Sequence, residues 1–382
     1  MKFEKNKETL TLFFEGELNS TNADRIEKEI DGILKKETFE SIILDFSNLT
    51  YISSAGLRIV LKLKQTYDKV TIIEASLEVY DIFSMTGFTN FMDVKKALKQ
   101  VDISNAEVIG DGFFSTVYRI DKDTIIKVFN RVSDPNQIER ELKLAKQAFI
   151  LGIPTAISFD IVKAGDKLGV RFEMLDCMSL KACVIAHPEK MVEYLNKYAA
   201  LLKKINTTEC FSPDIPHMKE FYEEKVEVIK PYLDKEHYAK LKKIIDDIED
   251  CNTFVHGDCH FKNIMVQKDE LLLIDMDTLS LGQPIFELAA IYCSYVAFDE
   301  DDPGNTEKFF GISRENANKL YNALVDRYLG KDDPIIKEKI QLIAYTHMIW
   351  WNRINEPDNK VRLEGCKSRL LPLLDKYNDV KF

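Results

Sequence analysis

The chain has 382 residues, 45% of them hydrophobic and 30% charged, with a formal net charge of −11. This length predicts about two to three globular domains, and the acidic balance argues against nucleic acid as the main partner, because phosphate contacts need patches of lysine and arginine. With no apolar stretch of the roughly 18 to 20 residues that span a bilayer, no signal-peptide pattern after Lys2 and no disulfide or zinc spacing among the seven cysteines, we expect a cytoplasmic protein without a membrane partner.

The first hundred residues alternate between strand and helix patterns. The predicted elements are a strand at 10–18, an amphipathic helix at 22–36, an apolar strand at 41–46, a loop from 48 that enters a helix ending near 67, and a strand at 70–73. The strand at 41–46 is apolar enough to be buried in a sheet. Strands that alternate with helices predict a small α/β layer.

Two serines, Ser53 and Ser54, stand where the helix after residue 48 should begin. A helix N-terminus offers free N–H groups and a partial positive charge, so it tolerates a phosphate, and the added charge would change a docking surface. The other interpretation is that both serines simply cap the helix. The residues themselves leave both interpretations open.

This region resembles the STAS domain of anti-sigma factor antagonists over residues 1–99. The resemblance is carried by Asp-Phe-Ser-Asn-Leu-Thr-Tyr-Ile-Ser-Ser-Ala-Gly-Leu from Asp45 to Leu57, and by Met-Thr-Gly-Phe at 85–88, which is similar to that domain's Thr-Gly-Leu turn. It implies that Ser54 matches the serine that a partner kinase phosphorylates, with Ser53 where an aspartate is common. It also implies a protein partner for this domain.

A glycine-rich turn and a lysine-bearing strand follow. Residues 108–118 read as strand, turn and strand, and the missing side chains of Gly110 and Gly112 would let the backbone approach phosphate oxygens. Lys127 lies inside the β-branched and aromatic run 124–129, which predicts a strand. Lysine is rarely buried without a partner, so Lys127 either has an anionic partner or faces solvent.

The expected partner of Lys127 is Glu141. A helix should begin at Asp134-Pro135 and end at Gly152, since the first pair is a cap followed by a first-turn proline. Its predicted apolar face consists of Ile138, Leu142, Ala145 and Phe149. Glu141 shares that face, where an unpaired carboxylate is costly; Glu139 points more to the side and is the fallback.

The most informative run is Val-His-Gly-Asp-Cys-His-Phe-Lys-Asn at 255–263, followed by an apolar strand that ends in Asp275. Phosphoryl transfer needs a carboxylate to orient the attacking hydroxyl, and an amide and a carboxylate to hold Mg²⁺. Asp258, Asn263 and Asp275 provide these groups, and oxygen ligands are those that Mg²⁺ prefers. Cys259 is either an oxidation-sensitive thiol or a small filler; His256 and His260, four apart, fit loop hydrogen bonding better than a metal pair.

Residues 104–382 resemble the aminoglycoside phosphotransferase and choline kinase-like branch of the protein kinase-like fold. The further segment Gly-Gln-Pro-Ile-Phe-Glu-Leu-Ala at 282–289 is similar to the branch's Gly-x-Pro-x-x-Asp-Leu-Ala, with Glu287 in place of the usual aspartate. The resemblance implies an α+β two-lobed domain, with an N-lobe at 104–176 and a C-lobe at 177–382. Glu173 would lie in the hinge strand, where backbone groups meet an adenine.

By this resemblance Asp258 is the catalytic base, Lys127 contacts the nucleotide phosphates, and Asn263 with Asp275 binds Mg²⁺. Asp277 either assists with metal or substrate or is a surface residue. The expected cofactors are ATP and Mg²⁺, although the sequence leaves GTP open.

The acceptor is the weakest part of the prediction. The acidic run at 299–302 would attract an aminated acceptor, or is a solvated loop. Trp350 and Trp351 belong to a predicted buried helix, where they line an acceptor pocket, hold a cation on their ring faces or pack in the core.

The leading interpretation is an ATP- and Mg²⁺-dependent phosphotransferase that acts on a hydroxyl of a small molecule and is regulated by the STAS domain. One variant has the kinase phosphorylate Ser54 of a STAS domain. The competing class is a regulatory protein with a nucleotide-sensing or inert kinase scaffold, and retention of Lys127, Asp258, Asn263 and Asp275 counts against inertness.

Overall fold

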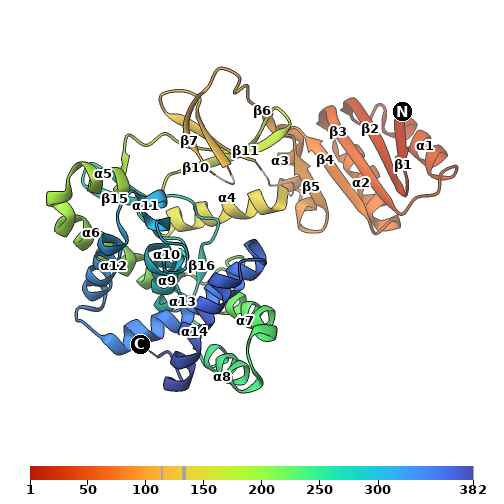
Figure 1. Cartoon of the computed structure of the whole chain (residues 1–382). Helices are drawn as coiled ribbons and strands as arrows, with labels where there is room; N and C mark the ends of the chain where they lie inside the picture. The colour runs from red at the N-terminus through yellow and green to blue at the C-terminus, as the bar shows by residue number, and fades with distance from the viewer. Residues whose placement is uncertain (113–114, 131–134, 382) are drawn as a thin grey trace. The chain divides into compact units, whose positions relative to one another are not determined.

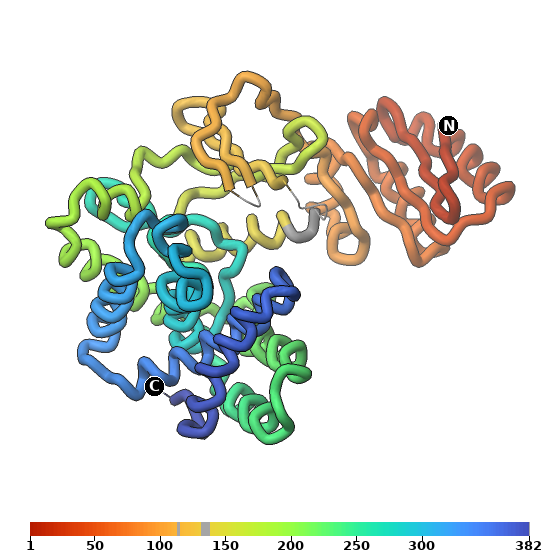
Figure 2. The backbone as a smooth tube through the Cα atoms, viewed as in Figure 1, coloured from red at the N-terminus to blue at the C-terminus, as the bar shows by residue number. Residues whose placement is uncertain are grey.

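The computed structural model describes residues 1–112, 115–130 and 135–381 (Figure 1). These residues form two compact units, one made of 1–101 with 162–166 and the other of the remaining described chain. Figure 2 traces the backbone of each unit by residue number. None of the helices in the described ranges combines the length and the apolar content that crossing a bilayer requires.

The first unit is a sheet with helices on one face. Its elements are β1 (Lys2–Asn6), β2 (Thr9–Leu18), α1 (Ala23–Leu34), β3 (Ser41–Ile52), α2 (Ser54–Thr66), β4 (Val70–Ala75), α3 (Leu77–Met85) and β5 (Asp93–Lys96). The strand order is β1-β2-β3-β4-β5, with β2 to β5 parallel and β1 antiparallel to β2. Buried and partly exposed residues alternate along β2 and β3, so one face of the sheet carries the core.

The expected α/β layer is present, with one difference at the start of α2. The residues from Asn48 to Ile52, expected as a loop, continue β3. They remain in the sheet because β2 follows them through two irregularities in register, between Phe13 and Glu15 and between Gly16 and Glu17. The helix therefore begins directly where the strand ends, at Ser54.

The N-lobe consists of a mixed sheet and one long helix. Its elements are β7 (Glu107–Asp111), β8 (Ser115–Arg119), β9 (Thr124–Phe129), α4 (Pro135–Ile150), β10 (Ser158–Ala164) and β11 (Lys167–Glu173); the sheet order is β6-β10-β11-β9-β8-β7, where β6 is Lys99–Gln100. Ile138 of α4 packs with Phe129 and Val170 of the sheet. This contact places the inner face of α4 behind β9.

The apolar face of α4 differs from the prediction at its C-terminal end. Phe149 is 45% exposed, whereas Leu144 and Ala148 are buried together with Ile138 and Ala145. Ala148 occupies the inward position, and the next residue is rotated by about 100° around the helix axis, so Phe149 points away from the core. The expected cap, Asp134, lies outside the described residues.

The C-lobe is mainly helical, with short strands around the loop that carries His-Gly-Asp. Its elements are β12 (Met178–Ser179), α5 (Leu180–Ala186), α6 (Met191–Thr207), α7 (Met218–Ile229), α8 (Lys235–Asp246), β13 (Phe254–Val255), β14 (Ile264–Gln267), β15 (Glu270–Leu273), β16 (Ser280–Leu281), α9 (Pro284–Tyr292), α10 (Phe298–Glu300), α11 (Asn305–Phe310), α12 (Arg314–Leu329), α13 (Pro334–Asn355) and α14 (Lys360–Lys376). Small sheets β12-β14-β15 and β13-β16 hold the two ends of that loop. Buried residues of α6, α9 and α13 belong to one core cluster beneath it.

Candidate active site

Lys127 is the centre of a charged cluster. It lies in the middle of β9, which pairs with β8 and β11. Its Nζ is 2.7 Å from Glu141 Oε1 and 2.7 Å from Asp275 Oδ1. Burial favours the neutral amine, but the charges of Asp275 and Glu141 outweigh it and raise the pKa of Lys127. The predicted pair with Glu141 is present, whereas Glu139 is exposed to solvent.

The two glycines of the turn are separated from this lysine by one strand, β8. Gly110 pairs with Val117, which pairs in turn with Lys127 across the sheet. The N–H of Gly112 donates to the carbonyl oxygen of Ser115 at 2.9 Å. Neither glycine has a positive φ, so what glycine supplies here is the missing side chain beside a candidate phosphate site. Phe113 and Phe114 of the same turn lie outside the described residues.

Both the backbone conformation and the close neighbours at position 257 require a glycine. Its φ is +80°, in the left-handed region that favours glycine. A Cβ at this position would lie 3.1 Å from Met218 Cε and 3.3 Å from the carbonyl oxygen of Thr278. The loop between β13 and β14 can therefore turn sharply, with Asp258 directly after the turn.

His256 holds the turn from inside. It is fully buried, and burial lowers its pKa to about 4. Its Nε2 lies 3.2 Å from the carbonyl oxygen of Ile274, while its Nδ1 accepts the backbone N–H of Asp258 at 3.3 Å. These partners suit a neutral imidazole with the proton on Nε2. His256 thus acts by hydrogen bonding in the loop, as expected.

Asn263 and Asp275 are brought together by a hairpin. Ile264 of β14 pairs with Leu273 of β15, and the N–H of Ile274 donates to the carbonyl oxygen of Asn263 at 2.9 Å. Asp275 follows with φ +68°, which is uncommon for a residue other than glycine. Asn263 Nδ2 donates to the Asp258 backbone oxygen at 3.0 Å and to Asp258 Oδ2 at 2.9 Å. Its Oδ1 is then left as the group that could bind a cation.

Three carboxylates, Asp258, Asp275 and Asp277, gather at this point, and the pKa values of Asp258 and Asp277 are raised. Desolvation, then the charges of Asp275 and Asp277, raise the pKa of Asp258 to about 8. Desolvation and Asp275 also raise the pKa of Asp277. A divalent cation would relieve this repulsion. Among the described residues no three His, Cys, Asp or Glu side chains form a metal site; Asn263 and Asp275 instead fit Mg²⁺, which combines few protein oxygens with nucleotide phosphates.

Glu287 supports the turn from α9. It is fully buried, and its Oε2 accepts the backbone N–H of His256 at 2.5 Å and that of Gly257 at 3.4 Å. Burial raises the pKa of Glu287 to about 7, against the effect of these hydrogen bonds. The sequence marked Glu287 only as a departure from a familiar motif. A single glutamate inside the apolar run Pro-Ile-Phe-Glu-Leu-Ala was the available sign of a buried acceptor.

Cys259 is a buried filler. It is 1% exposed, and burial raises the pKa of its thiol well above the ordinary value. The Tyr198 hydroxyl donates to the Cys259 carbonyl oxygen, and the Tyr295 hydroxyl accepts the N–H of Phe261 at 2.9 Å. These contacts hold the loop from below, and they favour the filler interpretation over that of a reactive thiol.

The side chain of Glu173, in the expected hinge strand, is hydrogen-bonded within the protein. Its Oε1 accepts the N–H of Ile157 at 2.7 Å, and its own N–H donates to the Ile157 carbonyl oxygen at 2.9 Å. Within the described ranges no hydrogen bond involves the backbone of Leu175, two residues further on. Within these ranges the backbone of Leu175 could therefore bind a ligand, whereas the Glu173 carboxylate already has a partner in the protein.

Ser54 is exposed at the first position of α2, in the first unit. Ser53 is the cap, and its side chain accepts the N–H of Ala55 at 3.2 Å. A Cβ at Gly56 would lie 2.7 Å from side-chain atoms of Ile52 and Leu18, so the helix start is tightly seated. The capping interpretation holds for Ser53, while the hydroxyl of Ser54 has no partner among the described residues.

The acidic run is paired within the protein and is not a solvated loop. Arg369 of α14 makes a bidentate pair with Asp301, with both N–O distances 2.8 Å. Asp299 is fully buried and accepts the N–H and hydroxyl of Thr306. Asp302 lies 3.7 Å from Arg362. The sequence could not show that α14, some sixty residues later, supplies these cations.

The predicted buried helix is present as α13, which buries Ile343, Tyr345 and Ile349, while its two tryptophans are half-buried. Arg362 lies 5.3 Å from the ring of Trp351, and Lys225 lies 5.1 Å from that of Trp350. The cations on these rings thus come from the protein itself.

Two lysines that the sequence did not single out lie at the loop that carries Asp258. Lys262 precedes Asn263 in the loop, and Lys181 is in the first turn of α5. Desolvation, then the charge of Lys181, lower the pKa of Lys262, while Asp258 opposes them. The position of Lys262 between Asp258 and Asn263 was the sequence signal that could have identified it.

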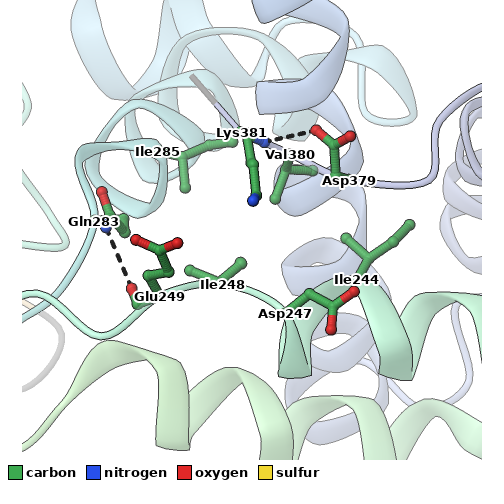
Figure 3. A pocket seen from close by; sticks show the side chains of 9 residues that line it. All are labelled: Ile244, Asp247, Ile248, Glu249, Gln283, Ile285, Asp379, Val380 and Lys381. Carbon is green, nitrogen blue, oxygen red and sulfur yellow. Dashed lines mark hydrogen bonds between the residues drawn. The ribbon is translucent and has the colours of Figure 1, made fainter.

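One cavity of about 230 Å³ lies away from all predicted site residues (Figure 3). Its lining comes from the end of α8, from the start of α9 and from the C-terminal residues 379–381. Gln283 Nε2 donates to the carbonyl oxygen of Glu249 across one side. The nucleotide and acceptor groups discussed above do not border it.

Two family models match the chain. The STAS domain model covers residues 1–101, and the model of the phosphotransferase enzyme family, APH, covers residues 105–317. BtrV of Bordetella bronchiseptica, named as an anti-sigma factor antagonist, is 34% identical over 84 residues, which are 21% of this chain and 72% of BtrV.

Among solved structures, the gentamicin complex of the aminoglycoside phosphotransferase APH(2'')-IIa is 14% identical. It covers 70% of this chain and 91% of its own, with a TM-score of 0.46. A choline/ethanolamine kinase family protein from Mesorhizobium loti is 10% identical and covers 72% and 93%, with the same TM-score of 0.46. Since the APH model spans more than half of the residues, the chain belongs to the phosphotransferase enzyme family and carries a STAS domain before its kinase-like domain.

Proposed function

We propose that this protein transfers the γ-phosphoryl group of ATP to a hydroxyl group of a small molecule. The observation that carries the proposal is the position of Asp275. Its carboxylate is 2.7 Å from Lys127, and its neighbour Ile274 is hydrogen-bonded to Asn263, which in turn holds Asp258. Groups for the phosphates, the cation and the acceptor therefore meet at one point.

Each group has a distinct part in the reaction. Lys127, fixed by Glu141, binds the nucleotide phosphates, and the glycine turn lets backbone N–H groups approach them. Asn263 and Asp275 would hold Mg²⁺, which neutralises charge on the β- and γ-phosphates. The hinge backbone near Leu175 receives the adenine.

Asp258 orients the acceptor and takes its proton. As the acceptor oxygen forms a bond with the γ-phosphorus, the bond from that phosphorus to the β,γ-bridging oxygen breaks, and ADP leaves with the electron pair. The hydrogen bond from Asn263 fixes the carboxylate, so that its other oxygen can face the hydroxyl.

The test is Mg-ATP turnover by the full chain, compared with Asp258→Ala and with Glu139→Gln, which alters an exposed carboxylate, as the control. We expect ADP release that requires Asp258 and is lowered by about a hundredfold or more in its variant. Nucleotide binding without any turnover would instead indicate a nucleotide-sensing scaffold.

A second candidate reaction is transfer to Ser54 of a STAS domain. The observation that favours it is the division of roles at α2: Ser53 caps the helix, and Ser54 is exposed with a free hydroxyl within the described structure. A phosphate at a helix N-terminus is stabilised by the local N–H groups. The protein would then be a signalling kinase with its own switch.

Intact mass before and after incubation with Mg-ATP separates the two reactions. A gain of one phosphate in the wild type, absent in Ser54→Ala and in Asp258→Ala but retained in Ser53→Ala, would identify transfer to Ser54. Unchanged mass together with Asp258-dependent turnover supports an external acceptor.

A further inference from the structure

Lys181 and Lys262 are joined to the candidate catalytic loop by backbone geometry. Lys262 lies four residues after Asp258 in that loop, and the backbone N–H of Lys181 donates to the carbonyl oxygen of Phe261 at 3.1 Å. The start of α5 is thus attached directly to the loop. Neither lysine belongs to the nucleotide and cation groups assigned above.

Both ammonium groups meet at one aromatic residue of α11. Lys262 Nζ is 4.0 Å from the ring centroid of Phe309, and Lys181 Nζ donates to the Phe309 carbonyl oxygen at 3.1 Å. Among the described residues neither lysine has a carboxylate within salt-bridge distance. Figure 1 shows α5 and α11 next to each other in the C-lobe. Two neighbouring cations without a carboxylate within ion-pair distance repel each other, and an anionic ligand would relieve that repulsion.

One imidazole ring separates these cations from the catalytic carboxylate. His260 Nε2 is 3.5 Å from Asp258 Oδ1, and the His260 ring packs edge-on to Phe309 with centroids 5.3 Å apart. Phe309 and Ile185 are 39% and 54% exposed, so apolar surface is available beside the lysines. The surroundings therefore suit a small molecule with a carbon skeleton and one charged end.

We propose that Lys181 and Lys262 bind an anionic group of the acceptor, a carboxylate or a phosphate, while its hydroxyl faces Asp258. This inference rests on the proposed phosphotransferase function and names its acceptor class. It reverses the expectation of an aminated acceptor, because the acidic run that suggested one is paired with Arg362 and Arg369. The nucleotide phosphates have Lys127 and the cation ligands as partners.

The experiment measures ADP release by the full chain with matched acceptors. One set is gluconate, glucose and glucosamine; the other is glycerate, glycerol 3-phosphate and glycerol. We expect the anionic members to have the highest kcat/KM, by about tenfold or more, and the comparison of glycerate with glycerol 3-phosphate decides between carboxylate and phosphate. Preference for glucosamine or for the neutral members would overturn the inference while the phosphotransferase function stands.

Variants locate the effect. Lys262→Met and Lys181→Met should each lower kcat/KM for the anionic acceptor by about ten- to a hundredfold, mainly through the acceptor KM, and Lys262→Arg should retain most of it. Lys308→Met, an exposed lysine next to Phe309, is the matched control and should change nothing. An equal loss for every acceptor with a raised KM for ATP would assign Lys262 to the nucleotide and contradict the proposal.

A second readout does not need turnover. Glycerate or glycerol 3-phosphate should raise the Tm of the wild type and of Asp258→Asn, and should not raise that of the Lys181→Met/Lys262→Met double variant. A shift without any turnover would sink the phosphotransferase function and keep the anion site. Turnover without charge preference and without a shift would sink the anion site alone.

Discussion

Glu141 and Glu139 differ by two residues, yet only one faces Lys127. Glu141 Oε1 is 2.7 Å from Lys127 Nζ, and Glu139 is exposed on the same helix. Glu141→Gln should lower Mg-ATP turnover by about tenfold or more, because it removes a buried charged hydrogen bond that positions the lysine. Glu139→Gln provides the matched control and should retain wild-type turnover. Equal effects in both variants would show that the pair does not position Lys127.

Gly257 combines backbone strain with close contact. Gly257→Ala should lower the free energy of unfolding by about 1–2 kcal/mol because of the left-handed backbone. The new methyl group must also displace Met218. Gly330 has a similar φ of +75° but open space around it, so Gly330→Ala should lose only the free energy that the left-handed backbone costs. We expect a larger loss of unfolding free energy and a loss of turnover for Gly257→Ala. Equal stability and activity in the two variants would contradict the steric argument.

The pKa of Glu287 leads to a pH dependence of stability. Its folded pKa of about 7 lies above the ordinary 4.5, so the folded state binds more protons between these values. The stability that Glu287 contributes is complete below pH 4.5 and is lost as the pH rises through 7. Relative to Glu287→Gln, the wild type should lose on the order of 3 kcal/mol across this window, as measured by urea unfolding. A difference that stays constant with pH would show that Glu287 does not titrate there.

At the scale of the elements, α14 neutralises the acidic run 299–302, which begins inside α10. Gly365 of α14 makes this possible, because a Cβ there would overlap the carboxylate of Asp301, which Arg369 holds. Glycine makes the helix less stable than alanine would, but it allows the two charged groups to approach closely.

Two glycine-to-alanine changes test this trade. Gly365→Ala should lower the free energy of unfolding by about 2–4 kcal/mol, since it disturbs a largely buried ion pair. Gly32→Ala, inside α1 with open space around it, should raise it by about 0.5–1 kcal/mol. Calorimetry of both variants measures the two signs. A stabilised Gly365→Ala protein would mean that the pair adapts without cost.

At the scale of the whole molecule, each of the two compact units has its own hydrophobic core cluster. We therefore expect two unfolding transitions in a calorimetric scan. Mg-ATP should raise the transition temperature of the kinase-like unit only. At a hundredfold excess over Kd it should add about 2.7 kcal/mol to the free energy of unfolding of that unit, and Asp275→Asn should remove this stabilisation. An equal shift of both transitions would show that the units unfold cooperatively.

Most elements of the fold follow from local patterns in the chain. The run 124–129 is the strand β9, and the proline and glycine signals around α4 place its ends closely, since Pro135 begins it and Gly152 follows it. The continuation of β3 to Ile52 could not be predicted, because it depends on the irregular pairing with β2. Phe149 was misassigned because a helical pattern does not say where the packing surface ends.

For the site, the sequence by itself determined the identity and order of the groups that phosphoryl transfer needs, because their spacing within one loop and one hairpin is local. Asp258, Asn263 and Asp275 were predicted in this way, whereas Lys127 was predicted from the lysine inside the strand pattern 124–129. Only the tertiary structure decided which distant residues neutralise or support them, since those contacts join segments far apart in the chain. Three such contacts are the ion pair of Arg369 with Asp301, the hydrogen bonds of Glu287 to the His-Gly-Asp turn, and the approach of Lys181 to Lys262.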